Sequence, residues 1–353
     1  MSLNLSADTL GNLLNQTLPF YIKNDLYAQA DQATPALRMF REKKETFSGG
    51  IGEIRFNTTF DPTMEWESYS GDDQLSFNKG NNTKQASYEW SENHLGLTLS
   101  FSELKAAGFS ITSGNSAMGD SFQAVGESDM IRITNHLKSK YEEMDFSSRQ
   151  SFSKDRIWSD GTNGFAGIPA LITGTPTVGV TGGISRVTNT KWRNRALVGA
   201  SKISYSVANQ TLTSTLREEV RLLRVNNGNP DMIFVGNKFM KALELEAQDK
   251  GQYTQVGFGS GKTQLGIKGL SLLGVGDVVY EPALDDLGFD DYAYILDSSK
   301  IKLFMLDGDD MVTHLPARPY DRMTFYKSIT WTGAMVAKQL NSSGVYQVND
   351  SGL

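Results

Sequence analysis

The stretch DPTMEWESYSGDDQLSFNKGNNTK, residues 61–84, separates two runs of sequence that alternate like β-strands. In residues 51–56, Ile54 and Phe56 alternate with charged side chains, and in residues 88–101 apolar side chains again recur at every second position. These features together predict a long two-stranded projection. A hairpin this narrow cannot bury large side chains within itself.

The projection nevertheless carries large apolar side chains, and they make it the candidate functional site. They are Met64, Trp66, Tyr69 and Phe77, with Trp90 following in the second strand. Such side chains pack either onto the body of the same chain or onto a neighbouring molecule, and an exposed group of them favours the neighbour. We therefore predict that Trp66, Tyr69, Phe77 and Trp90 lie in an interface between subunits.

The second strand-like run changes phase along its length. Its apolar side chains fall first at even positions and then at odd ones: Tyr88 and Trp90, then Leu95, Leu97, Leu99 and Phe101. Because strand side chains alternate with period two, this change predicts a bulge or twist near residues 91–94.

One long helix is predicted over residues 120–158. Its apolar residues are spaced by three or four, at Met130, Ile133, Leu137, Tyr141 and Met144. Such a helix would span roughly 50–60 Å and would act as a strut. A coiled-coil dimer is the alternative, but the heptad pattern does not persist and Gly126 interrupts it.

The remaining sequence divides into three kinds of segment: a polar arm, glycine-rich loops, and alternating helices and strands. Residues 1–50 form a polar arm with a short helix predicted at residues 10–18, and residues 159–189 form Gly-, Thr- and Pro-rich loops. The later part alternates helices and strands. Helices are predicted at residues 102–108, 213–225 and 237–249, and strands at residues 231–235, 270–273, 277–280, 293–296, 302–306, 323–331, 333–340 and 344–348.

Composition excludes several classes of protein. The 353 residues are 39% hydrophobic and 21% charged, which is typical of a globular protein, and no run approaches the length needed to span a bilayer. Cysteine is absent, which excludes disulfides and thiolate sites. The start of the sequence lacks the pattern of a signal peptide.

Charge argues against a nucleic-acid clamp. The net charge is −6, whereas proteins that neutralise phosphates normally carry a basic patch. Arg217, Arg221 and Arg224 have helical spacing, but Glu218 and Glu219 sit among them, so they are predicted to form a solvated helix face.

No catalytic residue, cofactor site or metal site is predicted. Residues 257–263, GFGSGKT, resemble a phosphate loop, but Val256 occupies the position of its first glycine. The histidines His94, His136 and His314 lack a partner at metal-ligand spacing. The acidic groups near residues 285–286, 290–291 and 307–310 do not match a calcium loop and are predicted to be solvated turns.

Several short sequence motifs, in their order along the chain, resemble those of the Hong Kong 97-like major capsid proteins of tailed bacteriophages. They are Gly182-Gly183-Ile184-Ser185-Arg186, Trp192-Arg193-Asn194, Asn229-Pro230-Asp231-Met232-Ile233-Phe234-Val235 and Thr330-Trp331-Thr332-Gly333-Ala334-Met335-Val336. The resemblance covers nearly the whole chain and implies an α+β fold of several parts. These would be an N-terminal arm (residues 1–50), an extended loop with supporting strands (51–101), a peripheral domain with a long spine helix (102–160 and 313–353, the helix at about 120–158), glycine-rich loops (159–189) and an axial domain (190–312).

The function implied by the resemblance is structural and not enzymatic. The chain would assemble with itself into hexamers and pentamers of an icosahedral head that encloses double-stranded DNA without specific binding. It would do so without a membrane, in the host cytoplasm during assembly and in the virion afterwards. Its other partners would be a portal and decoration proteins, and a separate scaffolding protein, because no long charged helical extension precedes the arm.

Some relatives in that family crosslink a loop lysine to an asparagine on a neighbouring subunit. Lys79 and Lys84 flank the loop tip, and Asn341 or Asn349 would be the acceptors, but the reaction also needs a carboxylate that spacing does not locate. Two other functions stay open. One is an encapsulin-like nanocompartment shell, and the other is a nucleotide-binding enzyme that uses residues 257–263.

Overall fold

The computed structural model describes most of the chain, and each of its two compact units is treated separately. The described residues are 32–50, 52–60, 64–75, 77, 82–100, 102–103, 111–114, 121–124, 127–206, 211–249, 271–272, 275–317 and 324–349. The first unit contains Glu92–Gln150 and Gly308–Trp331. The second contains Gln32–Ser91, Ser151–Asp307 and the chain from Thr332 onward.

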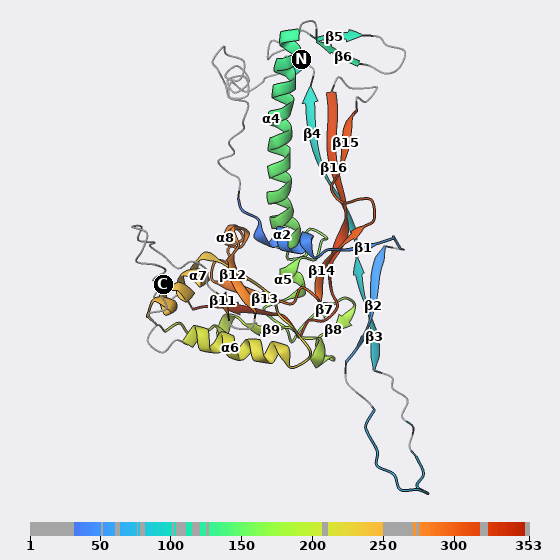
Figure 1. Cartoon of the computed structure of the whole chain (residues 1–353), viewed down its shortest axis with the longest axis vertical. Coiled ribbons are helices and arrows are strands. Elements are labelled where there is room, and N and C mark those ends of the chain that lie inside the picture. The colour runs from blue at the N-terminus through green and yellow to red at the C-terminus, as the bar shows by residue number, and fades with distance from the viewer. Residues whose placement is uncertain are drawn as a thin grey trace, which may run out of the picture. The chain divides into compact units, whose positions relative to one another are not determined.

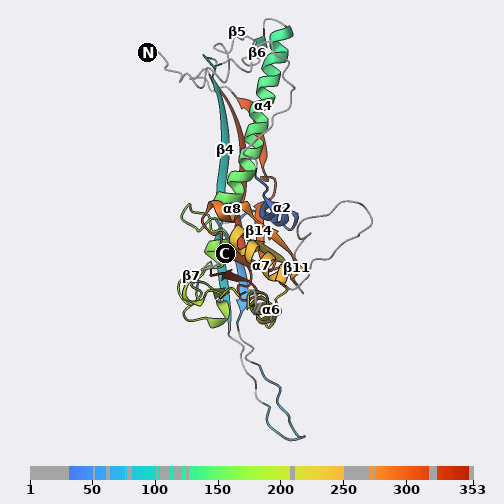
Figure 2. The ribbon, with the colours of Figure 1, turned by 90° about the vertical axis from the view of Figure 1, so that its left-hand side faces the viewer.

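A long helix beside an antiparallel sheet characterises the first unit (Figures 1 and 2). Helix α4 (Glu127–Phe152) runs along strands β4 (Ser91–Ser100), β15 (Val312–Ala317) and β16 (Thr324–Ala337), and β4 and β15 each pair with β16. The Lys327 ammonium on β16 lies 3.3 Å from the centroid of the Tyr141 ring on α4. This cation–π contact ties the helix to the sheet. Strands β5 (Ile111–Gly114) and β6 (Ser121–Ala124) form a separate ladder.

The predicted long helix is shorter than expected at its start. Helix α4 has 26 residues, which is about 39 Å, because residues 121–124 pair as strand β6 and do not join the helix. At its other end it widens into a π-helix, η1 (Ser153–Ile157), where the Trp158 amide donates to the carbonyl of Ser153, five residues earlier. Ile157 and Trp158 are buried. The apolar spacing identified the interior of the helix, whereas pairing and burial set its two ends.

A six-stranded mixed sheet forms the core of the second unit. Its order is β11 (Ser271–Leu272), β12 (Gly276–Tyr280), β10 (Met232–Val235), β13 (Tyr292–Leu296), β17 (Gly344–Gln347) and β9 (Arg195–Leu197). Helices α6 (Thr211–Arg224) and α7 (Asn237–Asp249) bury their apolar stripes against it. Phe239 is fully buried in this core, and burial of such a side chain contributes about 1.5–3 kcal/mol.

Two further strands of the second unit belong to the same sheet as β16. Strand β14 (Ile301–Leu306) pairs with the last residues of β16 and, in parallel, with β1 (Glu45–Phe47). The hairpin of β2 (Glu53–Thr59) and β3 (Thr83–Glu89) has a sheet of its own. The remaining elements are helices α2 (Pro35–Glu42), α5 (Ile168–Leu171) and α8 (Pro282–Asp286), the short helices η2 (Thr190–Trp192) and η3 (Gly199–Ser201), and the pair β7 (Val180–Thr181) and β8 (Ile184–Ser185).

The predicted strand over residues 88–101 was wrong in one respect. The phase change is not a bulge, since the run divides at Trp90 into β3, which pairs with β2, and β4, which pairs with β16. Each strand belongs to a different sheet, so each has its own inward face. A second difference is that residues 323–331 and 333–340 contribute to one continuous strand, β16. The predicted segments at residues 10–18, 104–108 and 257–263 lie outside the described residues.

Candidate functional site

The β2–β3 hairpin carries the loop that the sequence singled out. Its seven-pair ladder runs from Glu53 opposite Glu89 to Thr59 opposite Thr83, where the two hydroxyl oxygens lie 3.2 Å apart. The loop therefore leaves the hairpin where the ladder ends. In both views its described part, residues 64–75, extends away from the β2–β3 ladder (Figures 1 and 2).

Large apolar side chains of this loop are exposed to solvent. The exposed fractions are 69% for Met64, 105% for Trp66, 66% for Tyr69, 46% for Leu75 and 90% for Phe77. A local turn orders the backbone, because the Ser70 amide donates to the Asp73 carboxylate at 2.8 Å. An exposed group of this size on one projection marks an interaction surface.

Trp90 is placed differently from the other three predicted interface residues. It lies at the junction of β3 and β4, half-buried, with its ring centroid 6.1 Å from that of Phe47. Its packing thus includes a contact with its own chain. Trp66, Tyr69 and Phe77 are therefore the exposed aromatic members of the group, and the role of Trp90 in an interface stays a prediction.

Gly182 fastens the glycine-rich loops to the base of the hairpin. Its carbonyl accepts the Ser87 amide at 3.0 Å, and its φ of +57° is a conformation that favours glycine. A Cβ at this position would lie 2.9 Å from the Tyr88 ring. The Tyr88 hydroxyl in turn donates to the Ala337 carbonyl at 2.7 Å, and burial raises the Tyr88 pKa.

A buried guanidinium organises the neighbouring loops. Arg186 is 1% exposed and donates to the Thr181 and Thr173 hydroxyls, the Asn194 side-chain oxygen and the Leu171 carbonyl. Desolvation by burial lowers its pKa, and its partners are all uncharged oxygens. We call these five residues the Arg186 cluster.

The Arg186 cluster connects the two sequence motifs at residues 182–186 and 192–194, because Arg186 of the first donates to Asn194 of the second. The Trp192 indole donates to the Thr181 carbonyl at 2.9 Å, and its ring meets Phe60, at the start of the loop, edge-on at 6.0 Å. Lys84 donates to the Asn189 side chain at 2.9 Å. Both ends of the projecting loop are therefore held by residues 189–192, at the end of the glycine-rich loops. Lys79, the other crosslink candidate, lies outside the described residues.

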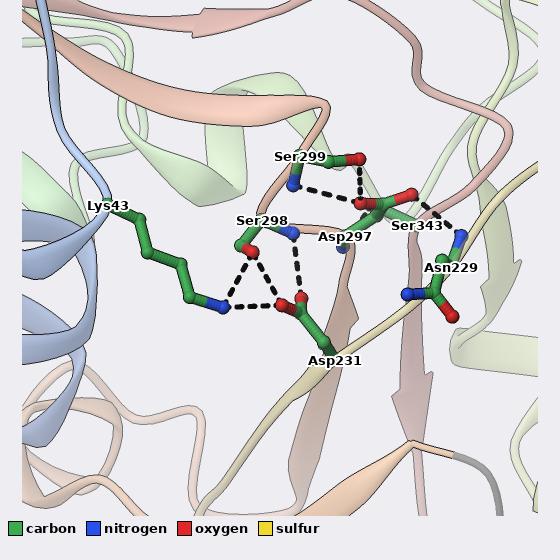
Figure 3. Close-up of polar contacts among 7 residues, drawn as sticks. All are labelled: Lys43, Asn229, Asp231, Asp297, Ser298, Ser299 and Ser343. Atoms are coloured by element: carbon green, nitrogen blue, oxygen red, sulfur yellow. Dashed lines mark hydrogen bonds and ion pairs between the residues drawn. The ribbon is translucent and has the colours of Figure 1, made fainter.

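A second polar cluster joins the segment after α2 to the α/β core (Figure 3). The Lys43 ammonium donates to the Asp231 carboxylate at 2.5 Å and to the Ser298 hydroxyl at 2.8 Å, and that hydroxyl also bonds Asp231. Burial opposes ionisation of Asp231, but the bonds from Lys43 and Ser298 outweigh it and lower its pKa. The Ser298 amide also donates to Asp231 at 2.8 Å, so the aspartate is bonded from both the Lys43 and the Ser298 side.

The neighbouring aspartate in Figure 3 has a turn-capping role. Asp297 accepts from the Ser299 amide and hydroxyl and from the Asn229 amide, while its own amide donates to Ser343. The Figure 3 cluster is therefore a structural tie between distant segments.

Glu281 is a buried carboxyl that the sequence did not reveal. It is 0% exposed and accepts the Ala36 amide at the start of α2 at 2.8 Å and the Ser153 hydroxyl of η1 at 3.4 Å. Burial raises its pKa from 4.5 to about 7 against these hydrogen bonds. No local pattern marks it, because its partners lie 245 and 128 positions away.

The other chemical candidates have structural partners or stay untested. Asp285 accepts from the Asn237 amide, Asp290 pairs with Lys238, and Asp291 accepts from Gln347, so these acidic residues stabilise the fold and are not merely solvated turns. His314 bonds the Thr330 hydroxyl at 2.9 Å. Across the described residues, no group of three or more His, Cys, Asp and Glu side chains could hold a metal ion.

Two further findings concern membranes and the α6 surface. Among the helices that the structure describes, none is both long and apolar enough to span a membrane.

Arg217, Arg221 and Arg224 are exposed on α6, as predicted, while Glu219 is buried and pairs with Arg195 at 2.6 Å.

Comparison with known proteins identifies the fold. No family model and no curated protein sequence matches the chain. Solved structures do match over nearly the whole length. A chain of the cyanophage A-1(L) capsid asymmetric unit has a TM-score of 0.61 at 12% identity, covering 94% of this chain and 97% of that one. A chain of the capsid of a native gene transfer agent particle has a TM-score of 0.53 at 11% identity, covering 98% and 99%.

A third match is a chain from Gordonia phage Cozz, with a TM-score of 0.51 at 12% identity, covering 99% and 97%. The chain therefore has an α+β fold shared with phage capsid chains. The likeness to phage capsid proteins that the sequence predicted is confirmed at the level of the fold.

Proposed function

We propose that this chain is the major capsid protein of a tailed bacteriophage, a subunit that assembles with itself into an icosahedral head around double-stranded DNA. The observation that carries the proposal is the loop with Trp66, Tyr69 and Phe77 exposed to solvent on a hairpin whose base is fixed. Apolar surface of this kind needs a neighbour to cover it. The shared fold with phage capsid chains indicates that the neighbour is another copy.

The proposal assigns parts of the Hong Kong 97-like layout to the observed elements. Helix α4 would be the spine helix of the peripheral domain, the β2–β3 hairpin would carry the extended loop, and the six-stranded sheet with α6 and α7 would be the axial domain. Many modest contacts per subunit would then hold a closed shell more tightly than any single pair. Hexamers, pentamers, a scaffolding protein, a portal and decoration proteins belong to the same proposal, as does location in the virion.

Electron microscopy and sedimentation of the purified chain test this function. We expect wild-type protein to form shells, shell fragments or rings, and Trp66→Ala with Phe77→Ala to sediment as small species. The free energy of unfolding of the subunit should change by less than about 0.5 kcal/mol, because both side chains are exposed. Trp66→Phe is the matched control and should still assemble.

A monomer at every concentration, in wild type and variants alike, would contradict the proposed function. Recovery of native particles distinguishes the nanocompartment alternative. DNA inside the particle supports a phage head, whereas a protein cargo without DNA supports a nanocompartment.

A further inference from the structure

A second surface feature of the same unit complements the projecting loop. A pocket of about 440 Å³ opens between the end of α6 and strand β9. Its lining includes the cations Lys191, Arg193 and Arg195 and the apolar side chains Pro176, Leu222 and Val225. Leu222 is 38% exposed and Val225 is 71% exposed, so apolar surface continues onto the rim. A pocket of this size is large enough for a sizeable organic group.

Two of the three cations of this pocket, Arg193 and Arg195, are held in position by the fold, and Lys191 is exposed. Arg193 donates to the carbonyls of Arg186 and Val187 at 2.7 and 3.0 Å, and Arg195 makes a two-pronged bond to Glu219 at 2.9 and 2.6 Å. No carboxylate side chain is among the lining residues. Glu219 partly compensates the Arg195 charge, whereas the two oxygens that accept from Arg193 are neutral backbone carbonyls. The pocket is thus preorganised for an apolar group with negative charge beside it.

The projecting loop has the opposite character. Between Met64 and Leu75 it contains Glu65, Glu67, Asp72 and Asp73 and no lysine or arginine. Two of these carboxylates flank Trp66, whose exposed fraction of 105% shows that its own chain does not cover it. Aromatic side chains framed by opposite charges give both affinity and register at an interface.

The two surfaces are different patches of one molecule, and this determines the type of contact. A loop that enters a pocket on another copy makes a heterologous contact, which can close into a ring or continue into a lattice. The described part of the loop extends away from α6 in Figure 1, so the geometry favours a pocket on another copy over the one on its own chain.

We propose that the acidic loop around Trp66 docks into the α6–β9 pocket of a second copy of this chain. Trp66 packs against Leu222 and Val225 there, and Glu65 and Glu67 face Lys191 and Arg193. The inference rests on the proposed function, because it names the receiving surface of the contact between subunits.

Disulfide trapping tests the docking, and the absence of native cysteine makes every crosslink assignable. The test variant carries Glu67→Cys and Asn226→Cys, the latter at the pocket lining. The control pairs Glu67→Cys with Lys241→Cys, an exposed position on α7. After mild oxidation of assembled protein, we expect a ladder of linked multimers on a non-reducing gel from the test pair and at least tenfold less from the control. A ladder, unlike a dimer alone, requires a heterologous contact.

Charge exchange gives a second measurement on the same assemblies. Lys191→Glu should reduce the assembled fraction severalfold, and adding Glu67→Lys should restore it. Assemblies that form normally but give no ladder above the control overturn the docking and leave the proposed function standing. Linked dimers without larger products also overturn it. No assembly of any kind overturns both proposals. Binding of a short DNA duplex that Lys191→Glu abolishes, without any ladder, would assign the pocket to nucleic acid and overturn the docking.

Discussion

Replacement of Glu281 by glutamine should change how stability depends on pH. Glu281 is fully buried, and its burial raises the pKa from 4.5 to about 7. The folded carboxyl therefore keeps a proton at pH values where the unfolded chain has lost it. The stability that this group contributes is fully present below pH 4.5 and is lost as the pH rises to about 7. Each pKa unit corresponds to about 1.4 kcal/mol, so the full loss is about 3–4 kcal/mol.

Glutamine removes the titration and keeps an oxygen that can accept the Ala36 amide. The free energy of unfolding of Glu281→Gln relative to wild type should rise by about 2–3 kcal/mol between pH 5 and pH 8. Most of that rise should occur below pH 7.

Urea unfolding of unassembled subunits at several pH values between 5 and 8 measures this difference. Tryptophan fluorescence reports on the relevant core, because the Trp158 ring lies 5.2 Å from Tyr294 and 5.8 Å from Phe234. Glu65→Gln, in the exposed loop, is the control and should follow the wild-type curve. A constant difference between Glu281→Gln and wild type across this range would refute the reasoning.

Two further substitutions probe how the hairpin base is held. Arg186→Lys should lower the free energy of unfolding by about 3 kcal/mol, because one ammonium cannot reach the four oxygens that the guanidinium bonds. Urea unfolding measures this change, and a urea midpoint equal to that of wild type would contradict it. Gly182→Ala should cost about 1–3 kcal/mol in thermal unfolding, since it adds positive-φ strain to a contact 2.9 Å from Tyr88. Gly183→Ala has similar strain but a nearest contact at 3.4 Å, so it should cost less, and equal losses would count against the packing argument.

Elements that depend on short-range pattern were predictable. Helix α7 spans Asn237–Asp249, as predicted, because a capping residue, an apolar period and a following glycine all lie within one stretch. Strand β10 was recognisable from its continuous apolar residues. The exposed loop was also predictable in kind, since no narrow hairpin can cover Trp66 and Phe77 itself.

Features that depend on distant partners were not predictable. The start of α4 is set by β-pairing of residues 121–124, and the division of the 88–101 run at Trp90 is set by two separate sheets. Neither sheet is evident from neighbouring residues.

The sequence by itself determined the alternation of helices and strands, the projecting aromatic loop and its acidic character, because each follows from residues a few positions apart. Only the tertiary structure decided which polar groups are buried and which distant segments of the chain bond to them. Burial raises the pKa of Glu281 even though residues 36 and 153 donate hydrogen bonds to it, and Arg186 is buried where four separate oxygens converge on it. Burial and electrostatic environment are properties of the whole packed chain, since water is excluded only where segments from far apart come together.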